Sequence, residues 1–586
     1  MKIQLIMRKI CTILFLSMMC LSAVAQSGYF FDMDELVASE GLYLPQNKPN
    51  PFNGSTDVYL AVVDGAEVRM VVADVYGNIE AQYSGSFEPG VHRLHLTLRP
   101  KGTHVLGIHQ NGKSSSIVLL CNEDGVTNRI EYVEFVEPID LELFRQLLNE
   151  DKNEEFEAYG AVETAKHASA AAGDFRVALS LSPFTLNQFD AGYTFKVGDQ
   201  TATTPADLQK IYQSLGSTEM YVRLATKRHK TYNADGTLDN TTDGKPDENA
   251  NVHTFDQVMQ TCRIAASLNI PINPEVMCAY IYMDMDGTQA PRFYKADYPE
   301  LYATNPTWAS ILKNGDAKWE ELSLDEICKV LEIYGEFVAD SILATGATVN
   351  DWNLGNEANF GFAGIGIGVP NSFDQTLASA GPMKRYMSSL FSLWWLKEHV
   401  WCYNVKQYAA VKRGILKAYT KAGKDASNVR FSTHIATVTS TPRATASFFK
   451  YMADNGYAVD VAGISYYPSA PAMSFNKKKM FTKTVTRINK KCGVPVFIGE
   501  FSYPSQDMVG PFAGWNKQLG EYKKDQQGQA DIYRDVITWG KNHGLIGIRY
   551  WAPDYEGEWY PMSMFTFEKK VGTAKTILLN HKEIVK

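Results

Sequence analysis

The chain has 586 residues, of which 45% are hydrophobic and 21% charged, and its formal net charge is −8. This length exceeds what one hydrophobic core supports, so we expect two or three domains, and the composition excludes a disordered or fibrous protein. The acidic balance argues against nucleic acid as a partner, because phosphates require a basic surface.

The first 25 residues have the pattern of a secretory signal peptide. Lys2, Arg8 and Lys9 precede the apolar run 10–21, and Ala23-Val-Ala25 supplies a small-residue cleavage site. Cys20 follows a methionine, whereas a lipidated cysteine normally follows a small residue. No later segment has the ~18 continuous apolar residues that a membrane span requires. We therefore expect an exported protein without a lipid anchor or transmembrane segment, either secreted or in the periplasm or at the cell surface.

Residues 26–125 are predicted to form a small β-sandwich, because short alternating segments are separated there by Gly, Pro and Asn turn signals. The segment Asn47-Lys-Pro-Asn-Pro-Phe-Asn53, followed by Val75-Tyr-Gly-Asn78 and Pro89-Gly-Val-His92, resembles a FlgD-type immunoglobulin-like module. Similar modules sort type IX-secreted proteins from the C-terminus. Here the module leads the chain, so we interpret it as a structural spacer.

Residues 126–172 become charged and alanine-rich and are predicted to form a helical connector. From residue 173 to residue 586, short buried apolar runs alternate with longer amphipathic stretches, which predicts a (β/α)8 barrel. The expected strands are 176–182, 220–224, 271–277, 351–355, 429–434, 459–465, 494–499 and 546–551. A doubly wound open sheet is the structural rival, but Gly364-Ile-Gly-Ile-Gly368 matches a phosphate-binding turn only superficially.

Two carboxylates follow strands of the predicted barrel, where active-site groups of this fold lie. Glu357 follows Asp351-Trp-Asn-Leu-Gly-Asn356, and Glu500 follows Val494-Pro-Val-Phe-Ile-Gly499. Glycosidic cleavage needs such a pair, one group to protonate the leaving oxygen and one to attack the anomeric carbon or to activate water. A separation of about 5–5.5 Å gives retention of configuration, and about 6.5–9.5 Å gives inversion. An isolated Gly-Glu would carry little weight, because glutamates at strand ends are common.

Asn-Glu at the fourth strand with Glu at the seventh resembles the pattern of clan A retaining glycoside hydrolases. That resemblance implies Glu357 as general acid/base, Glu500 as nucleophile and Asn356 as a hydrogen-bond partner of the sugar 2-hydroxyl. Several blocks are more closely similar to glycoside hydrolase family 53, the endo-β-1,4-galactanases. They are Leu354–Gly361, Ala410–Ala418 with Thr433–Ala436, Asp460–Pro468, Gly493–Pro504, and Gly528–Ala530 with Gly547–Pro553.

The first half of the predicted barrel departs from the family pattern. The Arg-x-Arg-x-Trp run after the second strand is reduced to Arg223, and the His-Tyr-Ser-Asp run after the third strand is replaced by Met277-Cys-Ala-Tyr-Ile-Tyr-Met-Asp284. Residues 362–405 form an insertion after the acid/base. These loops would line the sugar subsites, so they bear on the substrate more than on the reaction.

Four further residues are candidates for the site. Arg223 would pair with the nucleophile and keep it ionised. His434 would either touch the sugar or be a satisfied core histidine. Tyr466, in preference to Tyr467, would donate a hydrogen bond to the nucleophile, and Trp551 would stack beneath the bound sugar.

The sequence shows no nucleotide, flavin or haem signature and no complete metal-ligand set, since the aspartates at 235–239 and 284–286 lack the remaining ligands of a calcium loop. We therefore expect a monomeric enzyme that needs no cofactor and cleaves a plant-type polysaccharide internally, with β-1,4-galactan as the first candidate. The alternatives are the same fold and mechanism on a β-glucan or β-mannan, and a non-catalytic glycan-binding protein.

Overall fold

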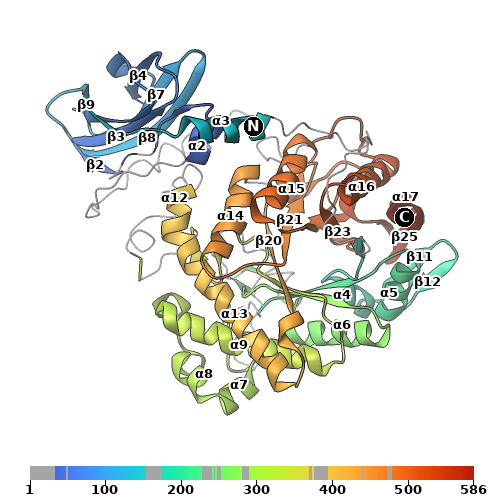
Figure 1. The fold of residues 1–586 in the computed structure, drawn as a ribbon. Coiled ribbons are helices and arrows are strands. Elements are labelled where there is room, and N and C mark those ends of the chain that lie inside the picture. The colour runs from blue at the N-terminus through green and yellow to red at the C-terminus, as the bar shows by residue number, and fades with distance from the viewer. Residues whose placement is uncertain are drawn as a thin grey trace. The chain divides into compact units, whose positions relative to one another are not determined.

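A computed structural model describes residues 33–45, 47, 50–74, 76–152, 175–226, 241–242, 245–246, 253–279, 290–367, 373–374, 393–437, 440–470 and 478–586 (Figure 1). The predicted signal peptide, the second half of the predicted connector and both aspartate-rich loops lie outside these residues. The chain divides into two compact units, with the change from one to the other near Glu155. None of the helices in the described part combines the length and the apolar character needed to cross a bilayer.

The first unit is a sandwich of two mainly antiparallel sheets. One sheet has the order β1-β3-β6-β9, and the other has the order β2-β8-β7-β4-β5. Alternate residues of the strands point into a shared core that includes Val58, Leu60, Met70 and Leu94, all fully buried. The strands are β1 Leu42–Tyr43, β2 Phe52–Asn53, β3 Ser55–Val62, β4 Glu67–Asp74, β5 Ile79–Ser86, β6 Gly90–Thr97, β7 Gly102–Gln110, β8 Lys113–Glu123 and β9 Arg129–Glu137.

The stretch 126–172, expected to be helical, begins with a strand. Strand β9 pairs antiparallel with β6 along its whole length and completes the first sheet. Apart from its terminal arginine and its three glutamates, its residues are all β-branched or aromatic, types that favour strands. The helix α3, Leu141–Lys152, follows β9, and its Phe144 packs with Leu36 of the helix α2, Met33–Ala38. The sandwich therefore extends beyond residue 125, the predicted boundary.

The second unit is built on eight parallel strands that follow one another around the sheet in chain order, as a (β/α)8 barrel requires. The predicted fold class is confirmed, and five of the eight strands are buried at every residue. The ring is nearly closed: Thr218, two residues before β13, makes two hydrogen bonds with Val177 of β10, of 2.8 and 2.9 Å. The strands are β10 Arg176–Ala178, β13 Met220–Leu224, β16 Ile272–Val276, β17 Asp351–Leu354, β20 Arg430–Ile435, β21 Val461–Tyr466, β22 Val496–Phe501 and β23 Leu545–Tyr550.

Helices lie around the outside of these strands (Figure 1). Three of them begin with a reciprocal capping box, formed by Thr204 with Asp207, Thr254 with Gln257, and Ser323 with Glu326. The helices are α4 Thr185–Asp190, α5 Pro205–Ser214, α6 Phe255–Ser267, α7 Pro299–Thr304, α8 Pro306–Ile311, α9 Leu324–Ala344, α13 Cys402–Lys421, α14 Pro442–Asp454, α15 Lys478–Cys492, α16 Gln526–Lys541, α17 Thr576–Leu579 and α18 His581–Val585. Along the chain, α12 Leu393–Leu396 and a π-helical turn, Lys397–Trp401, precede α13.

A second, four-stranded sheet joins the loop after the first barrel strand to the last part of the chain. Its order is β12-β11-β25-β24, and β11 pairs parallel with β25 from Thr194 opposite Val571 to Lys196 opposite Thr573. The strands are β11 Thr194–Val197, β12 Gln200–Ala202, β24 Phe565–Glu568 and β25 Val571–Ala574; the pairs β14 Thr241–Thr242 with β15 Lys245–Pro246 and β18 Gly361–Phe362 with β19 Ile365–Gly366 are separate.

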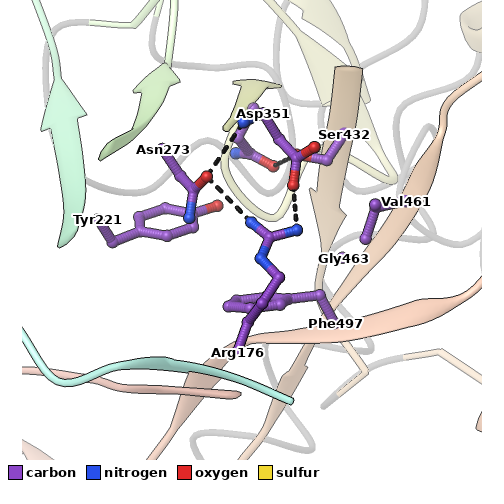
Figure 2. A pocket seen from close by; sticks show the side chains of 9 residues that line it. Arg176, Tyr221, Asn273, Asp351, Ser432, Val461, Gly463 and Phe497 are labelled. Atoms are coloured by element: carbon purple, nitrogen blue, oxygen red, sulfur yellow. Dashed lines mark hydrogen bonds and ion pairs between the residues drawn. The ribbon is translucent and has the colours of Figure 1, made fainter. Parts of the chain in front are cut away.

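A buried ion-pair network fills the barrel at the end where its strands begin (Figure 2). Arg176 Nε donates to Glu219 Oε2 at 2.7 Å, Nη2 donates to Asn273 Oδ1 at 3.0 Å, and Nη1 pairs with Asp351. The carboxylates of Glu219 and Asp351 are almost completely buried. Arg176 pairs with both, and Asp351 has a second cationic partner in Arg430, whose Nε lies 3.1 Å from Oδ1. Residues at this end of a (β/α)8 barrel usually contribute to stability, whereas active sites lie at the other end.

Replacement of Arg176 by methionine should destabilise the barrel by about 3–5 kcal/mol, because buried Glu219 loses its paired cation and buried Asp351 keeps only the half-exposed Arg430. The measurement is the urea dependence of the barrel's unfolding transition, followed by tryptophan fluorescence. Arg534→Met is the matched control, since Arg534 pairs with Asp531 at the surface and such pairs contribute about 0–1 kcal/mol. Equal unfolding midpoints for the two variants would contradict the structural role of Arg176.

Candidate active site

Glu357 lies just beyond β17, on backbone that only a few residue types adopt readily. Gly355 has φ +81° and Glu357 itself has φ +50°, in the left-handed region. A non-glycine residue in that region is strained and persists only where the surrounding structure fixes it, which is frequent at functional sites. The hydrogen bond from Gly355 N to Val276 O, 3.0 Å long, anchors this turn to the neighbouring strand. The turn brings the Glu357 carboxyl to the interior, where the residue is 6% exposed.

Glu500 projects from β22 and is held on both of its oxygens. Arg223 of β13 pairs with Oε1 through Nη2, and the hydroxyl of Tyr467 donates to Oε2. A guanidinium and a hydroxyl donor both favour the carboxylate form over the acid. The predicted pairing of Arg223 with this glutamate therefore agrees with the geometry of the site.

The two glutamates lie close together in the barrel mouth. One oxygen of Glu357, one oxygen of Glu500 and a ring nitrogen of His434 lie within 4.8 Å of one another. This spacing is well below the range of about 6.5–9.5 Å that leaves room for a water molecule between carboxyl groups. The arrangement therefore suits direct attack by one of them on a carbon held between the two.

The environments of the two glutamates differ. Burial, followed by the negative charge of Glu500, raises the pKa of Glu357 from its ordinary value of 4.5 to about 7. Glu357 can therefore both donate and accept a proton near neutral pH, as a general acid/base must. Glu500 instead accepts one hydrogen bond on each oxygen, from Arg223 and from Tyr467.

A second buried carboxylate, Glu275 of β16, balances the charge of Arg223. Glu275 Oε1 pairs with Arg223 Nε, and Oε2 lies 3.6 Å from Arg549 Nη1. Burial alone would raise the pKa of Glu275, but Arg223, His434 and Arg549 outweigh it and lower the value to about 2. Glu275 is thus a permanent anion that fixes the orientation of the arginine on the nucleophile.

Arg223 also orders the rest of the site. Its Nη2 donates to Asn356 Oδ1 at 2.6 Å, which fixes the orientation of the Asn356 amide. Its guanidinium carbon lies 4.3 Å from the ring centroid of Trp551, and that of Arg549 lies 4.8 Å from the same ring. Trp551 is therefore oriented by two cations. The expected contacts of Asn356 and Trp551 with a sugar stay predictions.

His434 is fully buried and linked to the acid/base through Ser465. His434 Nε2 lies 2.7 Å from Ser465 Oγ, and Ser465 Oγ donates to Glu357 Oε1 at 2.5 Å. On its other side, His434 Nδ1 lies 3.6 Å from Glu275 Oε2. His434 is therefore buried behind Glu357, and its expected contact with a sugar stays a prediction.

The expectation for Tyr466 requires a correction, because Tyr467 and not Tyr466 donates to Glu500. The Tyr466 ring stacks on Phe481 of α15 with centroids 4.0 Å apart. Side chains alternate between the two faces of a strand, so Ser465 points into the barrel, Tyr466 points to the helix layer and Tyr467 points inward again. Every residue of β21 is buried, so the sequence pattern alone does not reveal this phase. The nearby register shift has its extra residue on β22 and places Glu500 opposite Ser465.

Aromatic side chains gather around Trp551. The cluster contains buried Tyr467, Trp551 and Trp559, with partly buried rings at its edge. The edge residues are Phe184, Phe512, Trp515 and Tyr555. Phe184 and Tyr555 stack with centroids 3.9 Å apart. Rings of this kind suit the apolar faces of sugars.

The donor set Glu357, His434 and Glu500 has the spacing that a metal ion needs, but its electrostatics oppose one. The guanidinium of Arg223 already pairs with Glu500, and the raised pKa of Glu357 favours a protonated carboxyl rather than a ligand. The three residues therefore fit an acid/base and nucleophile pair better than a metal centre.

Three residues of the site were absent from the sequence-based candidates, namely Glu275, Ser465 and Arg549. Each lies inside a buried strand. A charged residue within a run that is otherwise apolar is itself a signal, because buried charges require partners. Asn-Pro-Glu in β16 and Ile-Arg-Tyr in β23 carry that signal, whereas nothing in the sequence marks Ser465.

Comparisons with known proteins agree with this geometry. The family model described as Glycosyl hydrolase family 53 matches residues 307–582, which include Glu357 and Glu500 but not Arg223 or Glu275. Comparison with curated proteins found no match.

Solved structures also resemble this chain at low identity. A GH53 catalytic domain from Ignisphaera aggregans is 16% identical with a TM-score of 0.48, and covers 72% of this chain and 99% of that chain. A structure of fungal beta-1,4-galactanases is 14% identical with a TM-score of 0.47, and covers 70% and 99%. A β-glucuronidase from Ruminococcus gnavus is 10% identical with a TM-score of 0.30, and covers 93% and 67%. Likeness at this level says nothing about what a protein acts on.

Replacement of Glu500 by glutamine should lower the pKa of Glu357 to between 4.5 and about 7, because the neighbouring negative charge is removed while burial remains. Titration of labelled glutamate carboxyls, followed by infrared spectroscopy or carbon NMR, would measure the pKa of Glu357. The exposed carboxylate of Asp507 pairs with Lys524, so Asp507→Asn is a control that should leave the value unchanged. A pKa of Glu357 that stays at about 7 in Glu500→Gln would contradict the electrostatic coupling.

Proposed function

The chain belongs to glycosyl hydrolase family 53 over residues 307–582, and from that premise we propose that it is an exported, retaining endo-β-1,4-galactanase with Glu357 as acid/base and Glu500 as nucleophile. The proposal rests on one observation: two adjacent carboxyl groups have different environments. Glu500 is held by Arg223 and Tyr467, while the pKa of Glu357 is raised to about 7. Pairs of carboxyl groups in contrasting environments have contrasting roles in catalysis.

In the first step, the Glu500 carboxylate attacks the anomeric carbon and the glycosidic carbon–oxygen bond breaks. The protonated carboxyl of Glu357 gives its proton to the departing oxygen, so the leaving sugar departs as an alcohol. The product of this step is a glycosyl ester on Glu500. Arg223 and Tyr467 hold the attacking carboxylate ionised and oriented until the bond forms.

In the second step, Glu357 acts as a base. Its carboxylate removes a proton from a water molecule while that water attacks the anomeric carbon, the ester bond breaks and Glu500 is released. The two inversions retain the configuration of the sugar. Donor atoms within 4.8 Å of one another support this route over single displacement.

The substrate proposal rests on the second half of the barrel. The blocks similar to family 53 include Asp460–Pro468, which supplies Ser465 and Tyr467, and Gly493–Pro504, which supplies Glu500. Galactan is the first candidate for that reason. Export rests on the pattern of the first 25 residues.

Glu357→Ala should lose about 10²–10⁴ in kcat/KM on polysaccharide, because the leaving oxygen is no longer protonated. The decrease in kcat/KM of Glu357→Ala on a dinitrophenyl glycoside should be much smaller, since that leaving group needs no proton. Azide should restore turnover of Glu357→Ala and give a β-glycosyl azide. Glu500→Ala should be inactive on both substrates, and azide should there give the α-anomer. Asp507→Asn is the control, and wild-type activity in Glu500→Ala would disprove the mechanism.

On a panel of galactan, β-glucan and β-mannan, the protein should release oligosaccharides from galactan, with retained configuration in the first products. Proton NMR of the newly formed reducing ends would record the configuration, and chromatography would record product lengths. Release of oligosaccharides only from β-glucan or β-mannan would contradict the proposed substrate but not the proposed mechanism. Retention of a glycan on the wild-type protein without hydrolysis would identify a binding protein instead.

A further inference from the structure

We propose that Glu357, Ser465 and His434 share one proton, which makes Ser465 and His434 positioning residues for the acid/base. Two hydrogen-bond lengths place the three groups in line, 2.5 Å from Ser465 Oγ to Glu357 Oε1 and 2.7 Å from Ser465 Oγ to His434 Nε2. All three residues are buried. A hydroxyl group has one proton, so Ser465 donates to one neighbour and accepts from the other.

Two arrangements of the protons are compatible with the hydrogen bonds between Glu357, Ser465 and His434. In the first, the Glu357 carboxyl is protonated and donates to Ser465, which donates to neutral His434. In the second, Glu357 is a carboxylate that accepts from Ser465, and the Nε2–H of a cationic His434 donates to Ser465. The arrangements interconvert when Glu357 passes its proton to Ser465 Oγ and Ser465 passes its own proton to His434 Nε2. One O–H bond breaks at Glu357, one N–H bond forms at His434, and no proton enters or leaves.

The charges that surround His434 favour sharing of a single proton. Two carboxylates and two guanidinium groups face this part of the barrel from four other strands and balance one another. They are Glu275 of β16, Glu500 of β22, Arg223 of β13 and Arg549 of β23. The buried cluster is therefore neutral when either Glu357 or His434 carries the shared proton, and unbalanced when both or neither does. In both neutral arrangements, Nδ1–H of His434 faces Glu275 Oε2 at 3.6 Å.

Two glycines keep the His434 ring in place. A Cβ atom at Gly499 would lie 3.0 Å from the imidazole Cδ2 and Cγ atoms, and one at Gly463 would lie 2.9 Å from His434 Cα. Backbone of β21 and β22 therefore closes directly on the histidine. A ring confined in this way keeps Nε2 on Ser465 in both arrangements.

The shared proton matches what the proposed function, on which this inference rests, requires of Glu357. Before the first step the carboxyl must hold a proton, and the first arrangement places it there. Before the second step the carboxylate must persist in a buried site, and the Ser465 hydroxyl then stabilises it by donation. The hydrogen bond from Ser465 and the charge of His434 both lower the pKa of Glu357, against the larger effect of burial, which raises it.

Nitrogen NMR of histidine-labelled protein tests the shared proton without any substrate. In wild type, the Nε2 shift of His434 should report partial protonation. Ser465→Ala leaves Nε2 without a partner at that position, so His434 should become the neutral tautomer with its proton on Nδ1. Ser465→Thr should restore the wild-type shift. Identical Nε2 shifts in wild type and Ser465→Ala would overturn the proposal, whether or not the protein hydrolyses galactan.

Kinetics then tests the positioning role. In Ser465→Ala the alkaline limb of kcat/KM should move to higher pH, because a donor that lowers the pKa of Glu357 is lost. With an activated aryl glycoside, kcat and KM should fall together by about tenfold, because the carboxylate needed for the second step is less stable and the glycosyl-enzyme accumulates. Ser465→Thr should restore both properties.

Ser502→Ala is the matched control, since Ser502 is also buried and its hydroxyl contacts Met562 Sδ at 3.1 Å. An unmoved alkaline limb in Ser465→Ala, with equal losses on activated and unactivated substrates, would reduce Ser465 to a structural residue and overturn its positioning role. Absence of hydrolysis by the wild type on every glycan would refute the proposed function, while the NMR shifts would still decide whether the proton is shared.

Discussion

The catalytic end of the barrel depends on one buried cation. The side chain of Arg223 is 1% exposed, yet it pairs with Glu275 and Glu500, donates to Asn356 and lies over the ring of Trp551. Two carboxylates without such a partner would be far too costly to bury as anions. Because Glu275 supplies a second, permanent negative charge, the guanidinium holds the nucleophile without neutralising the whole site. The position of one side chain on β13 thus determines the position of groups on β16, β17, β22 and β23.

Both ends of the barrel contain buried ion pairs, but the two networks are organised for different tasks. At the end where the strands begin, Arg176 pairs with both Glu219 and Asp351, whose side chains are almost completely buried. At the other end, the cations reach Glu500 and Glu275, and Glu357 interacts instead with the Ser465 hydroxyl. The same chemistry of arginine and carboxylate therefore stabilises one end and leaves a titratable group at the other.

The sequence allowed the barrel, both glutamates and Arg223 to be predicted, because strand ends and buried runs depend on local pattern. Tyr466 and Tyr467 could not be told apart, since every residue of β21 is buried and the pattern does not show which of two adjacent residues points inward. Ser465 carries no sequence signal, because its role comes from neighbours on β17 and β20 that only the closed barrel brings together. Strand β9 was assigned to the connector because a glutamate at every third position interrupts the two-residue alternation expected of a strand. The predicted signal peptide and the domain boundaries stay predictions.

The parallel pairing of β11 with β25 affects the order in which the chain folds. Thr194 and Val571 are neighbours in a sheet although almost the whole barrel lies between them in sequence. Contacts of such long range close late in folding, because the entropy of a large loop is lost before they form. The loop after the first barrel strand, which contributes Phe184 to the aromatic cluster, cannot be anchored until the final strands have been made. Synthesis from the N-terminus therefore yields Glu357 and Glu500 before the surface around them is complete.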